Sequence, residues 1–315
     1  MARALTPVHF AMPNVRITDV SPRDGLQNES AMIAAADKAQ LVRLLCAACV
    51  DEVEVTSFVS PKWVPQLGDA GAVLADLAAS APSPLTSRPL FSALVPNERG
   101  LDSALTFLQG PAALGKLSLF AAASETFSQK NTNGSISQVL ERFVPVMHRI
   151  RALPHRILVR GYISCVVACP FEGLIAPAQV VDVAKKLIAM GVDEIDLGDT
   201  IGAATRETTR ELLNIYAREI GLVTTASPVT LHLHDTFGHA ADCVRVALDA
   251  GITSFDGSVA GLGGCPYAST PTRRAPGNID TALLVNTVHA AGFTTHVDLD
   301  ALACASQYAR KLVQR

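Results

Sequence analysis

Short apolar segments rich in β-branched residues alternate along the chain with longer segments rich in alanine and leucine. The short segments have the length and composition of strands, and the longer ones those of helices. We expect strands over Val15–Val20, Glu52–Ser57, Leu90–Val95, Lys116–Phe120, Ile157–Ser164, Glu194–Leu197, Val229–His234 and Thr253–Ser258. Helices are expected between them, for example over Asp37–Ala48, Ala176–Met190 and Thr205–Ile220.

This strand–helix alternation predicts an α/β fold, and its length and number of repeats favour a (β/α)8 TIM barrel. An open doubly wound sheet has the same periodicity and is the alternative fold. The segment after Asn278 predicts extra C-terminal helices, and Ser80–Arg88, with two prolines among serines, predicts a surface loop. We therefore expect an N-terminal extension over 1–14 and a single TIM-barrel catalytic domain over 15–315.

The composition adds limits on partners and location. Hydrophobic residues make up 49% of the 315 residues and charged residues 17%, which is typical of a compact globular protein. The net charge of −3 gives no general attraction to nucleic acid or to an anionic membrane, so neither is expected as a partner. We see no apolar stretch of membrane-spanning length and no secretory signal, and we expect a cytoplasmic protein. Seven cysteines, an odd number, argue against a disulfide framework.

Two histidines, His232 and His234, stand two positions apart in an expected strand, so their side chains project to the same side. Asp24 follows the first expected strand, within Ser21–Glu29. If both strands end at one rim of a barrel, two imidazoles and a carboxylate converge there. A lone histidine is more often a core residue, but this set predicts a divalent-metal site. It suits Mg²⁺, Mn²⁺ and Zn²⁺ and does not choose among them.

Charged residues next to the expected site point to the same chemistry. Arg23 precedes Asp24 and would place a second positive charge where an oxyanion forms, although the two residues can also be a structural ion pair. Glu54 lies inside an apolar strand, where an unpaired carboxylate is costly. It is therefore expected to form a buried salt bridge, with Arg23 as the candidate partner.

The segment Ser258–Tyr267 is rich in glycine and contains Cys265. A phosphate cradle is one interpretation, but the segment lacks the Lys-Ser/Thr pair of a P-loop. We favour a mobile loop that carries Cys265 over the barrel mouth, where a thiol can give or take a proton. Cys165 and Cys169 also lie close together in sequence, and that pair is expected to be structural rather than metal-binding.

In these motifs the chain resembles the hydroxymethylglutaryl-CoA lyase family, within the metal-dependent barrel lyases and synthases that act on enolates. The resemblance extends from about Val15 to the C-terminal helices. It rests on Arg23–Glu29, Thr56–Gln66, Ala122–Glu125, Arg160–Tyr162, Leu197–Gly202, the histidine pair and the cysteine loop.

The resemblance implies cleavage of the acyl-CoA substrate 3-hydroxy-3-methylglutaryl-CoA to acetyl-CoA and acetoacetate, with Mg²⁺ or Mn²⁺ as cofactor, by a homodimer. It implies three sets of residues in this sequence. The metal ligands are Asp24, His232, His234 and Asn278; the catalytic residues are Arg23, Asp24, Glu54, His232 and Cys265; the substrate-binding residues are Arg23, Gln27, Ser57 and Asp199. In these roles Arg23 stabilises an enolate, Cys265 transfers a proton and Glu54 supports the metal site. The general base is Asp24 or His232.

One segment departs from the family pattern. Pro266–Gly277, between Cys265 and Asn278, is longer than the usual family loop and contains Arg273 and Arg274. These arginines are expected either to contact a substrate carboxylate or CoA phosphate, or to be exposed loop charges. Three alternative functions stay open: the same chemistry on a longer or differently branched 3-hydroxyacyl-CoA, a Claisen-type synthase, and a barrel that binds CoA thioesters without turning them over.

Overall fold

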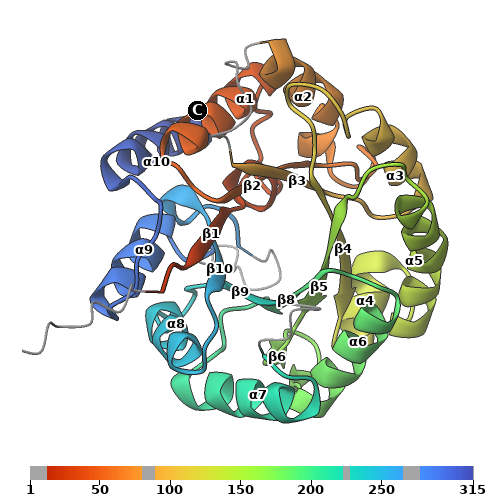
Figure 1. Ribbon diagram of the computed structural model, residues 1–315, viewed down its shortest axis with the longest axis vertical. Coiled ribbons are helices and arrows are strands. Elements are labelled where there is room, and N and C mark those ends of the chain that lie inside the picture. The colour runs from red at the N-terminus through yellow and green to blue at the C-terminus, as the bar shows by residue number, and fades with distance from the viewer. Residues whose placement is uncertain (1–12, 80–88, 223–227, 265–276, 315) are drawn as a thin grey trace, which may run out of the picture.

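Parallel strands form a closed barrel at the centre of the molecule, and helices form a ring around it (Figure 1). This computed structural model describes residues 13–79, 89–222, 228–264 and 277–314. The barrel strands, in chain order, are β1 (Arg16–Asp19), β2 (Glu52–Ser57), β3 (Leu90–Leu94), β4 (Lys116–Ala122), β5 (Leu158–Ser164), β8 (Glu194–Asp199), β9 (Val229–Leu233) and β10 (Ser254–Gly257). The expected loop Ser80–Arg88 lies outside the described residues.

Closure of the barrel follows from the pairing of its first and last strands. Residue Arg16 of β1 is aligned with Ser254 of β10, and Thr18 of β1 is also aligned with Glu52 of β2. All neighbouring barrel strands run parallel, in the order β1-β10-β9-β8-β5-β4-β3-β2. The (β/α)8 prediction is therefore confirmed, and the open sheet is excluded.

Each barrel strand is followed by one or two helices. These are α1 (Ala35–Ala47), α2 (Ala70–Ala79), α3 (Glu98–Leu105), α4 (Glu125–Thr132), α5 (Ile136–Arg151), α6 (Pro177–Ala189), α7 (Arg206–Glu219), α8 (Ala240–Asp249) and α9 (Thr281–Ala290). The predicted extra C-terminal helix is α10 (Leu299–Val313), which lies between α9 and α1 in the outer ring (Figure 1). Its first turn is capped by Asp298, whose side chain accepts hydrogen bonds from the backbone of Asp300 and Ala301.

A small hairpin of β6 (Ala168–Cys169) and β7 (Gly173–Leu174), which the periodicity does not predict, follows β5. Strands this short carry too few residues for a period-2 signal. The Cys165–Cys169 segment leads into this hairpin, and Sγ of Cys169 accepts a hydrogen bond of 3.0 Å from Oγ of Ser124.

The barrel interior is polar, although apolar residues fill the layer between strands and helices. On several strands, buried polar residues stand two positions apart: Glu52 and Glu54, Arg160 and Tyr162, Glu194 and Asp196, Thr230 and His232, Ser254 and Asp256. Lys116 bridges two of these strands, with Nζ 2.5 Å from Oε2 of Glu52 and 2.7 Å from Oε2 of Glu194. Buried carboxylates are tolerated here because guanidinium and ammonium groups pair with them.

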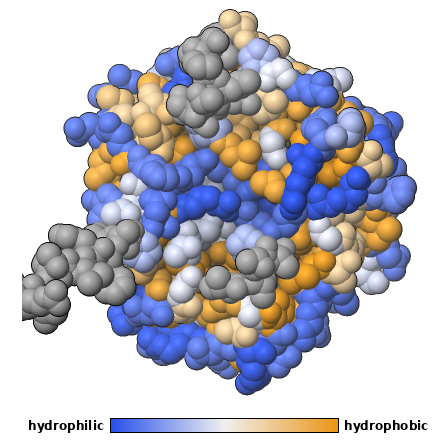
Figure 2. Space-filling model, viewed as in Figure 1, coloured by the Kyte–Doolittle hydropathy of each residue, from blue (hydrophilic) through white to orange (hydrophobic). Residues whose placement is uncertain are grey.

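On the face seen in Figure 2, hydrophilic residues form a band across the middle, with hydrophobic areas on either side of it. None of the helices in the described ranges combines the length and the apolar character that a membrane crossing requires.

Candidate active site

Arg23 and Asp24 lie in a tight helical turn, η1 (Ser21–Gly25), that follows β1 directly. The turn is held by hydrogen bonds from the backbone N–H groups of Arg23, Asp24 and Gly25 to the carbonyl of Val20. Both charged side chains are buried, with only 7% and 9% of their surfaces exposed. The turn therefore presents a guanidinium and a carboxylate to the barrel mouth at fixed positions.

The guanidinium of Arg23 contacts two carboxylates. Its Nε donates a hydrogen bond of 2.5 Å to Oε2 of Glu54, and its Nη1 donates one of 2.7 Å to Oδ1 of Asp24. Burial alone would lower the pKa of Arg23, but the charges of Glu54 and Asp24 outweigh it and raise that pKa. Arg23 is thus a permanent cation, and the expected salt bridge with Glu54 is present.

Asp24 is ionised in this setting. Burial alone would raise the pKa of its carboxyl group, but the positive charge of Arg23 and the nearby imidazoles outweigh that effect and lower it to about 2. Its oxygens also accept hydrogen bonds from Nε2 of Gln27 at 2.6 Å and from Nδ2 of Asn278 at 2.8 Å. The predicted substrate-binding residue Gln27 thus contacts a predicted metal ligand.

His232 lies in β9 and His234 directly follows it, and both side chains project to one side, as their spacing predicts. Nδ1 of His234 donates a hydrogen bond of 2.8 Å to the backbone carbonyl of Asp199, because a carbonyl can only accept. Burial and the neighbouring His232 lower the pKa of His234 to about 4, so its imidazole is neutral near pH 7. Its Nε2 consequently carries a free lone pair.

Asp24, His232 and His234 form one group of potential metal ligands. One ligating atom from each residue lies within 4.8 Å of the others. Oδ2 of Asp24 is 4.0 Å from Nε2 of His232. An ionised carboxylate and neutral imidazoles are ligands that divalent ions accept.

Asn278, the fourth expected ligand, contacts this group. Asn278 lies near the start of the described range 277–314 and pairs with His234 in an isolated β-bridge. Its Nδ2 donates to Asp24 and, at 3.0 Å, to the carbonyl of Leu262. Its Oδ1 is buried and has no hydrogen-bond partner among the described residues. A buried acceptor without a donor fits a ligand that binds a cation.

The glycine-rich segment packs its backbone directly against these ligands. Gly263 has φ of +104°, and a Cβ atom there would lie 2.6 Å from Nδ2 of Asn278 and 3.3 Å from Oδ2 of Asp24. Only glycine adopts this backbone conformation without strain and leaves room for both side chains. Cys265, Arg273 and Arg274 lie outside the described residues, so the predictions for them stay predictions.

Two other predicted substrate-binding residues have local partners. Oγ of Ser57, at the end of β2, accepts a hydrogen bond of 3.1 Å from the backbone of Val59. The carboxylate of Asp199 accepts from the backbone N–H groups of Ala203 at 3.1 Å and Ala204 at 2.8 Å. Burial raises the pKa of Asp199 to about 6. Their contact with substrate remains a prediction.

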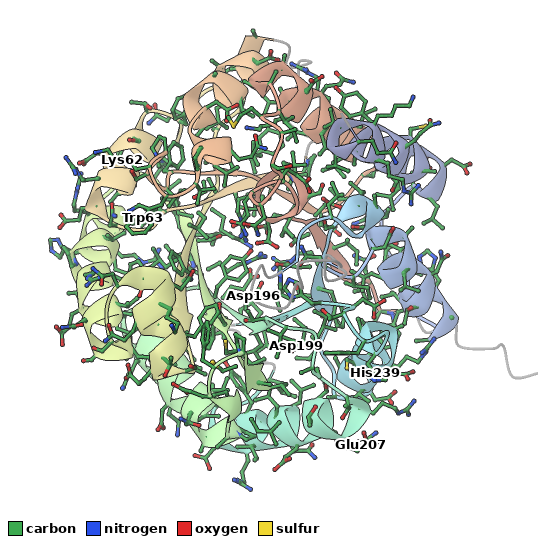
Figure 3. The ribbon with its side chains drawn as sticks, turned by 180° about the vertical axis from the view of Figure 1, so that it is seen from behind. Lys62, Trp63, Asp196, Asp199, Glu207 and His239 are labelled. Carbon is green, nitrogen blue, oxygen red and sulfur yellow. The ribbon has the colours of Figure 1, made fainter. Side chains whose placement is uncertain are left out.

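Three buried residues beneath the ligand group, Asp256, Asp196 and Tyr162, were not singled out from the sequence as site residues. Nδ1 of His232 lies 3.2 Å from Oδ2 of Asp256, and the hydroxyl group of Tyr162 lies 3.2 Å from Oε2 of Glu54. Asp196 lies near the centre of the barrel, whereas Trp63 of the Thr56–Gln66 motif lies towards the outer ring (Figure 3). The signal for these residues is the polar residue at every second strand position.

The closed barrel and the ligand group at the ends of its strands define a TIM-barrel protein whose donor set suits a divalent ion. The chain belongs to the HMGL-like family, whose model matches residues 14–308, and the resemblance expected from the sequence is thereby confirmed.

Similar proteins include a 3-hydroxy-3-isohexenylglutaryl-CoA/hydroxy-methylglutaryl-CoA lyase of Pseudomonas aeruginosa, 44% identical over 93% of this chain and 91% of the relative. The hydroxymethylglutaryl-CoA lyase of Pseudomonas mevalonii is 41% identical over 93% of this chain and 90% of its own length. A crystal structure of hydroxymethylglutaryl-CoA lyase from Pseudomonas aeruginosa matches with a TM-score of 0.85 and 42% identity, and it covers 96% of this chain and 95% of that one.

Proposed function

We propose that this protein is a carbon–carbon lyase that cleaves 3-hydroxy-3-methylglutaryl-CoA to acetyl-CoA and acetoacetate. The observation that carries the proposal is the contact of 2.7 Å between Arg23 and Asp24, because it joins a permanent cation to the group formed with His232 and His234. The names of the relatives support the reaction, since both described above are lyases of this substrate class. The synthase and the non-catalytic barrel find no such support.

The residues that would hold the metal are Asp24, His232, His234 and Asn278. Their donors fit a divalent ion: an ionised carboxylate, a neutral imidazole at His234 and an amide oxygen that lacks a donor. When bound, Mg²⁺ or Mn²⁺ would act as a Lewis acid on the substrate's hydroxyl and carboxylate oxygens. The choice of Mg²⁺ or Mn²⁺ as the cofactor is part of this proposal.

Cleavage requires a base at the tertiary hydroxyl group. The base takes the hydroxyl proton, the carbonyl of acetoacetate forms, and the bond to the thioester's α-carbon breaks. The electron pair of that bond moves into the thioester and gives the enolate of acetyl-CoA. Asp24 and His232 are the candidates for the base, because carboxylates and imidazoles are side chains that take up protons in general acid–base catalysis.

Arg23 is placed to stabilise the enolate. A guanidinium carries more N–H donors than Glu54 and Asp24 accept, so part of the donor fork can face the thioester oxygen. The two carboxylates fix the orientation of Arg23 before substrate binds, which reduces reorganisation as negative charge develops. Protonation of the enolate carbon then yields acetyl-CoA, a step that we assign to Cys265.

Other parts of the proposal extend it to the whole protein. We infer that Gln27, Ser57 and Asp199 help bind the substrate and that residues 1–14 form an extension of a single catalytic domain. A cytoplasmic location, a homodimer and the absence of a nucleic-acid partner complete the proposal, and they are supported by charge, composition and family resemblance.

The direct test is incubation of the purified protein with 3-hydroxy-3-methylglutaryl-CoA, with and without a chelator and with added Mg²⁺ or Mn²⁺. We expect equal amounts of acetyl-CoA and acetoacetate by mass spectrometry, loss of both with chelator, and recovery with metal. A 3-hydroxyacyl-CoA with a longer branch is the comparison substrate, because one relative is named for both.

Three results would overturn the proposal. They are no cleavage of any thioester with metal present, cleavage of the longer substrate alone, or consumption of acetyl-CoA together with a 2-oxo acid. Arg23→Gln is the matched inactive variant, and Arg245→Gln, at an exposed pair with Asp242, is the control for loss of a positive charge.

A further inference from the structure

Asp256 lies directly beneath the ligand His232. It belongs to β10, is aligned with His232 of β9 in the parallel pairing, and is buried with 2% of its surface exposed. Its Oδ2 is 3.2 Å from Nδ1 of His232, the ring nitrogen that faces away from Asp24. Through this contact Asp256, in the polar barrel interior, touches His232 of the ligand group.

The surroundings of Asp256 favour its ionised form. Nη1 of Arg160 donates to both of its oxygens, at 3.3 and 3.4 Å, and the hydroxyl group of Tyr162 donates at 3.3 Å. An ionised carboxylate accepts hydrogen bonds and cannot donate them, so Nδ1 of His232 must be the donor.

We propose that Asp256 is a positioning residue for His232: it accepts the Nδ1 proton, fixes the tautomer, and so directs the lone pair of Nε2 towards Asp24 and the metal. The metal part of this inference rests on the proposed function, whereas the tautomer does not. A carboxylate behind an imidazole also strengthens that imidazole as a ligand. His234 has a weaker support, because its Nδ1 donates to the neutral carbonyl of Asp199. The two histidines are therefore unequal ligands.

A second metal site is the competing interpretation of the same residues. One ligating atom each of Asp196, His232 and Asp256 lies within 4.8 Å of the others. However, Nη1 of Arg160 is 3.3 Å from Oδ1 of Asp256 and 3.5 Å from Oδ2 of Asp196, so a guanidinium already supplies the positive charge there. The geometry thus favours a support for His232 over a second cation.

Nuclear magnetic resonance of the metal-free protein, with ¹⁵N-labelled histidine, tests the tautomer directly. At about pH 8, where an ordinary imidazole is neutral, we expect the His232 signal to be that of the Nδ1–H tautomer. His232→Gln, which removes one pair of signals, assigns it. An Nε2–H tautomer in the wild type would overturn the proposal without any need for a variant at Asp256.

Asp256→Asn then tests the role of the carboxylate, and Asp196→Asn is the matched control. Both variants make the same carboxyl-to-amide change in the same buried cluster, but only Asp256 has a hydrogen bond with the imidazole. Asp256→Asn should reduce the Nδ1–H signal of His232 and leave that of His234 unchanged. Asp196→Asn should change neither. Equal effects of the two variants would show a general structural role and overturn the proposal.

Metal binding provides the second measurement. Calorimetric titration with Mn²⁺ should give a Kd about 10- to 100-fold higher for Asp256→Asn than for the wild type, with Asp196→Asn close to wild type. An unchanged Kd in Asp256→Asn would overturn the metal part of the inference. If the protein binds Mn²⁺ as expected and cleaves no thioester, the proposed function fails and the inference about Asp256 stands.

Discussion

Oε2 of Glu54 accepts a hydrogen bond of 2.5 Å from Nε of Arg23, although the residues lie on different strand–loop units of the barrel. Glu54 has no exposed surface, and Arg23 has only 7%. Two buried charges in this contact hold each other's position, and Asp24 holds the other side of the guanidinium. Arg23 is therefore oriented before any substrate arrives, which is the condition for effective stabilisation of a developing negative charge.

Replacement of Arg23 by lysine should remove most of the catalytic rate. An ammonium group is a point charge on a flexible stem and cannot reach two carboxylates and a substrate oxygen at once. We expect kcat for Arg23→Lys to fall by about 100-fold or more, with a smaller change in KM. Steady-state kinetics measure both constants, with Arg245→Lys as the surface control. Turnover near that of the wild type would contradict the enolate role.

Glu54→Gln should lower the stability of the folded protein as well as its catalytic rate. The variant leaves the buried guanidinium of Arg23 with only Asp24 as a charged partner. Loss of one partner in a buried ion pair costs about 3 kcal/mol, and urea unfolding of the metal-free protein measures this change. In the double variant Arg23→Met/Glu54→Gln the loss should be smaller than the sum of the single losses. Additive losses would show that the two charges do not depend on each other.

The fold could be predicted from the sequence because each strand and helix carries its own local signal. The expected strand Glu52–Ser57 has the observed bounds, and Val229–His234 differs by one residue from β9. His232 and His234 were found for the same reason, since alternation along a strand places them on one side. The periodicity does not give the turn η1, which is too short for a helical pattern and is held by local hydrogen bonds to the carbonyl of Val20.

The support for the ligands could not be predicted in the same way. The sequence shows Asp256 only as a polar residue in a short strand. Its contact with His232 depends on the register between β9 and β10, which the sequence does not give. Arg160 and Asp196 meet it only because the barrel closes, and closure is not visible in periodicity. Alternating polar residues in most strands do signal a polar interior, but they do not give the pairing.

The pH dependence of stability should contain a contribution from Asp19. This residue has no exposed surface, and burial raises the pKa of its carboxyl group from 3.8 to about 6, although Ser21, Thr281 and Val259 donate hydrogen bonds to it. The folded protein therefore holds the proton more tightly than the unfolded chain does. The associated stability is present in full below about pH 4 and is lost as the pH rises through about 6.

The size of this effect is about 3 kcal/mol, most of it between about pH 4 and pH 6. The difference in unfolding free energy between the wild type and Asp19→Asn isolates it, because other titrating groups are common to both proteins. With rising pH, the wild type should lose stability relative to the variant and then level off above about pH 7. A constant difference across this range would show that Asp19 is ionised throughout.

Removal of divalent ions should lower the thermal stability together with the activity. A metal that binds only the folded state stabilises it by about 2.7 kcal/mol at about 100 times its Kd. The Tm of chelated protein should therefore rise on addition of Mn²⁺ and much less in His234→Gln, which loses one ligand. His289→Gln, outside the ligand group on α9, is the control. An equal rise in Tm for wild type and His234→Gln would remove His234 from the ligand set.

Gly263→Ala should impair the metal site through the backbone of the glycine-rich segment. The new Cβ atom would lie 2.6 Å from Nδ2 of Asn278, too close for both atoms to keep their positions. Gly251→Ala is a matched control, since Gly251 also has positive φ, at +91°, but a Cβ there meets nothing within 4 Å. Both substitutions carry a backbone cost of about 1 kcal/mol.

Only Gly263→Ala should displace Asn278. We therefore expect similar backbone costs in urea unfolding, an added loss for Gly263→Ala, and a Kd for Mn²⁺ raised about 10-fold in that variant alone. Because the two glycines share the same sign of φ, the comparison separates strain in the chain from displacement of a ligand. If Gly263→Ala bound Mn²⁺ as tightly as Gly251→Ala, the amide of Asn278 would not be a ligand, and the ion would be held by Asp24 and the two imidazoles.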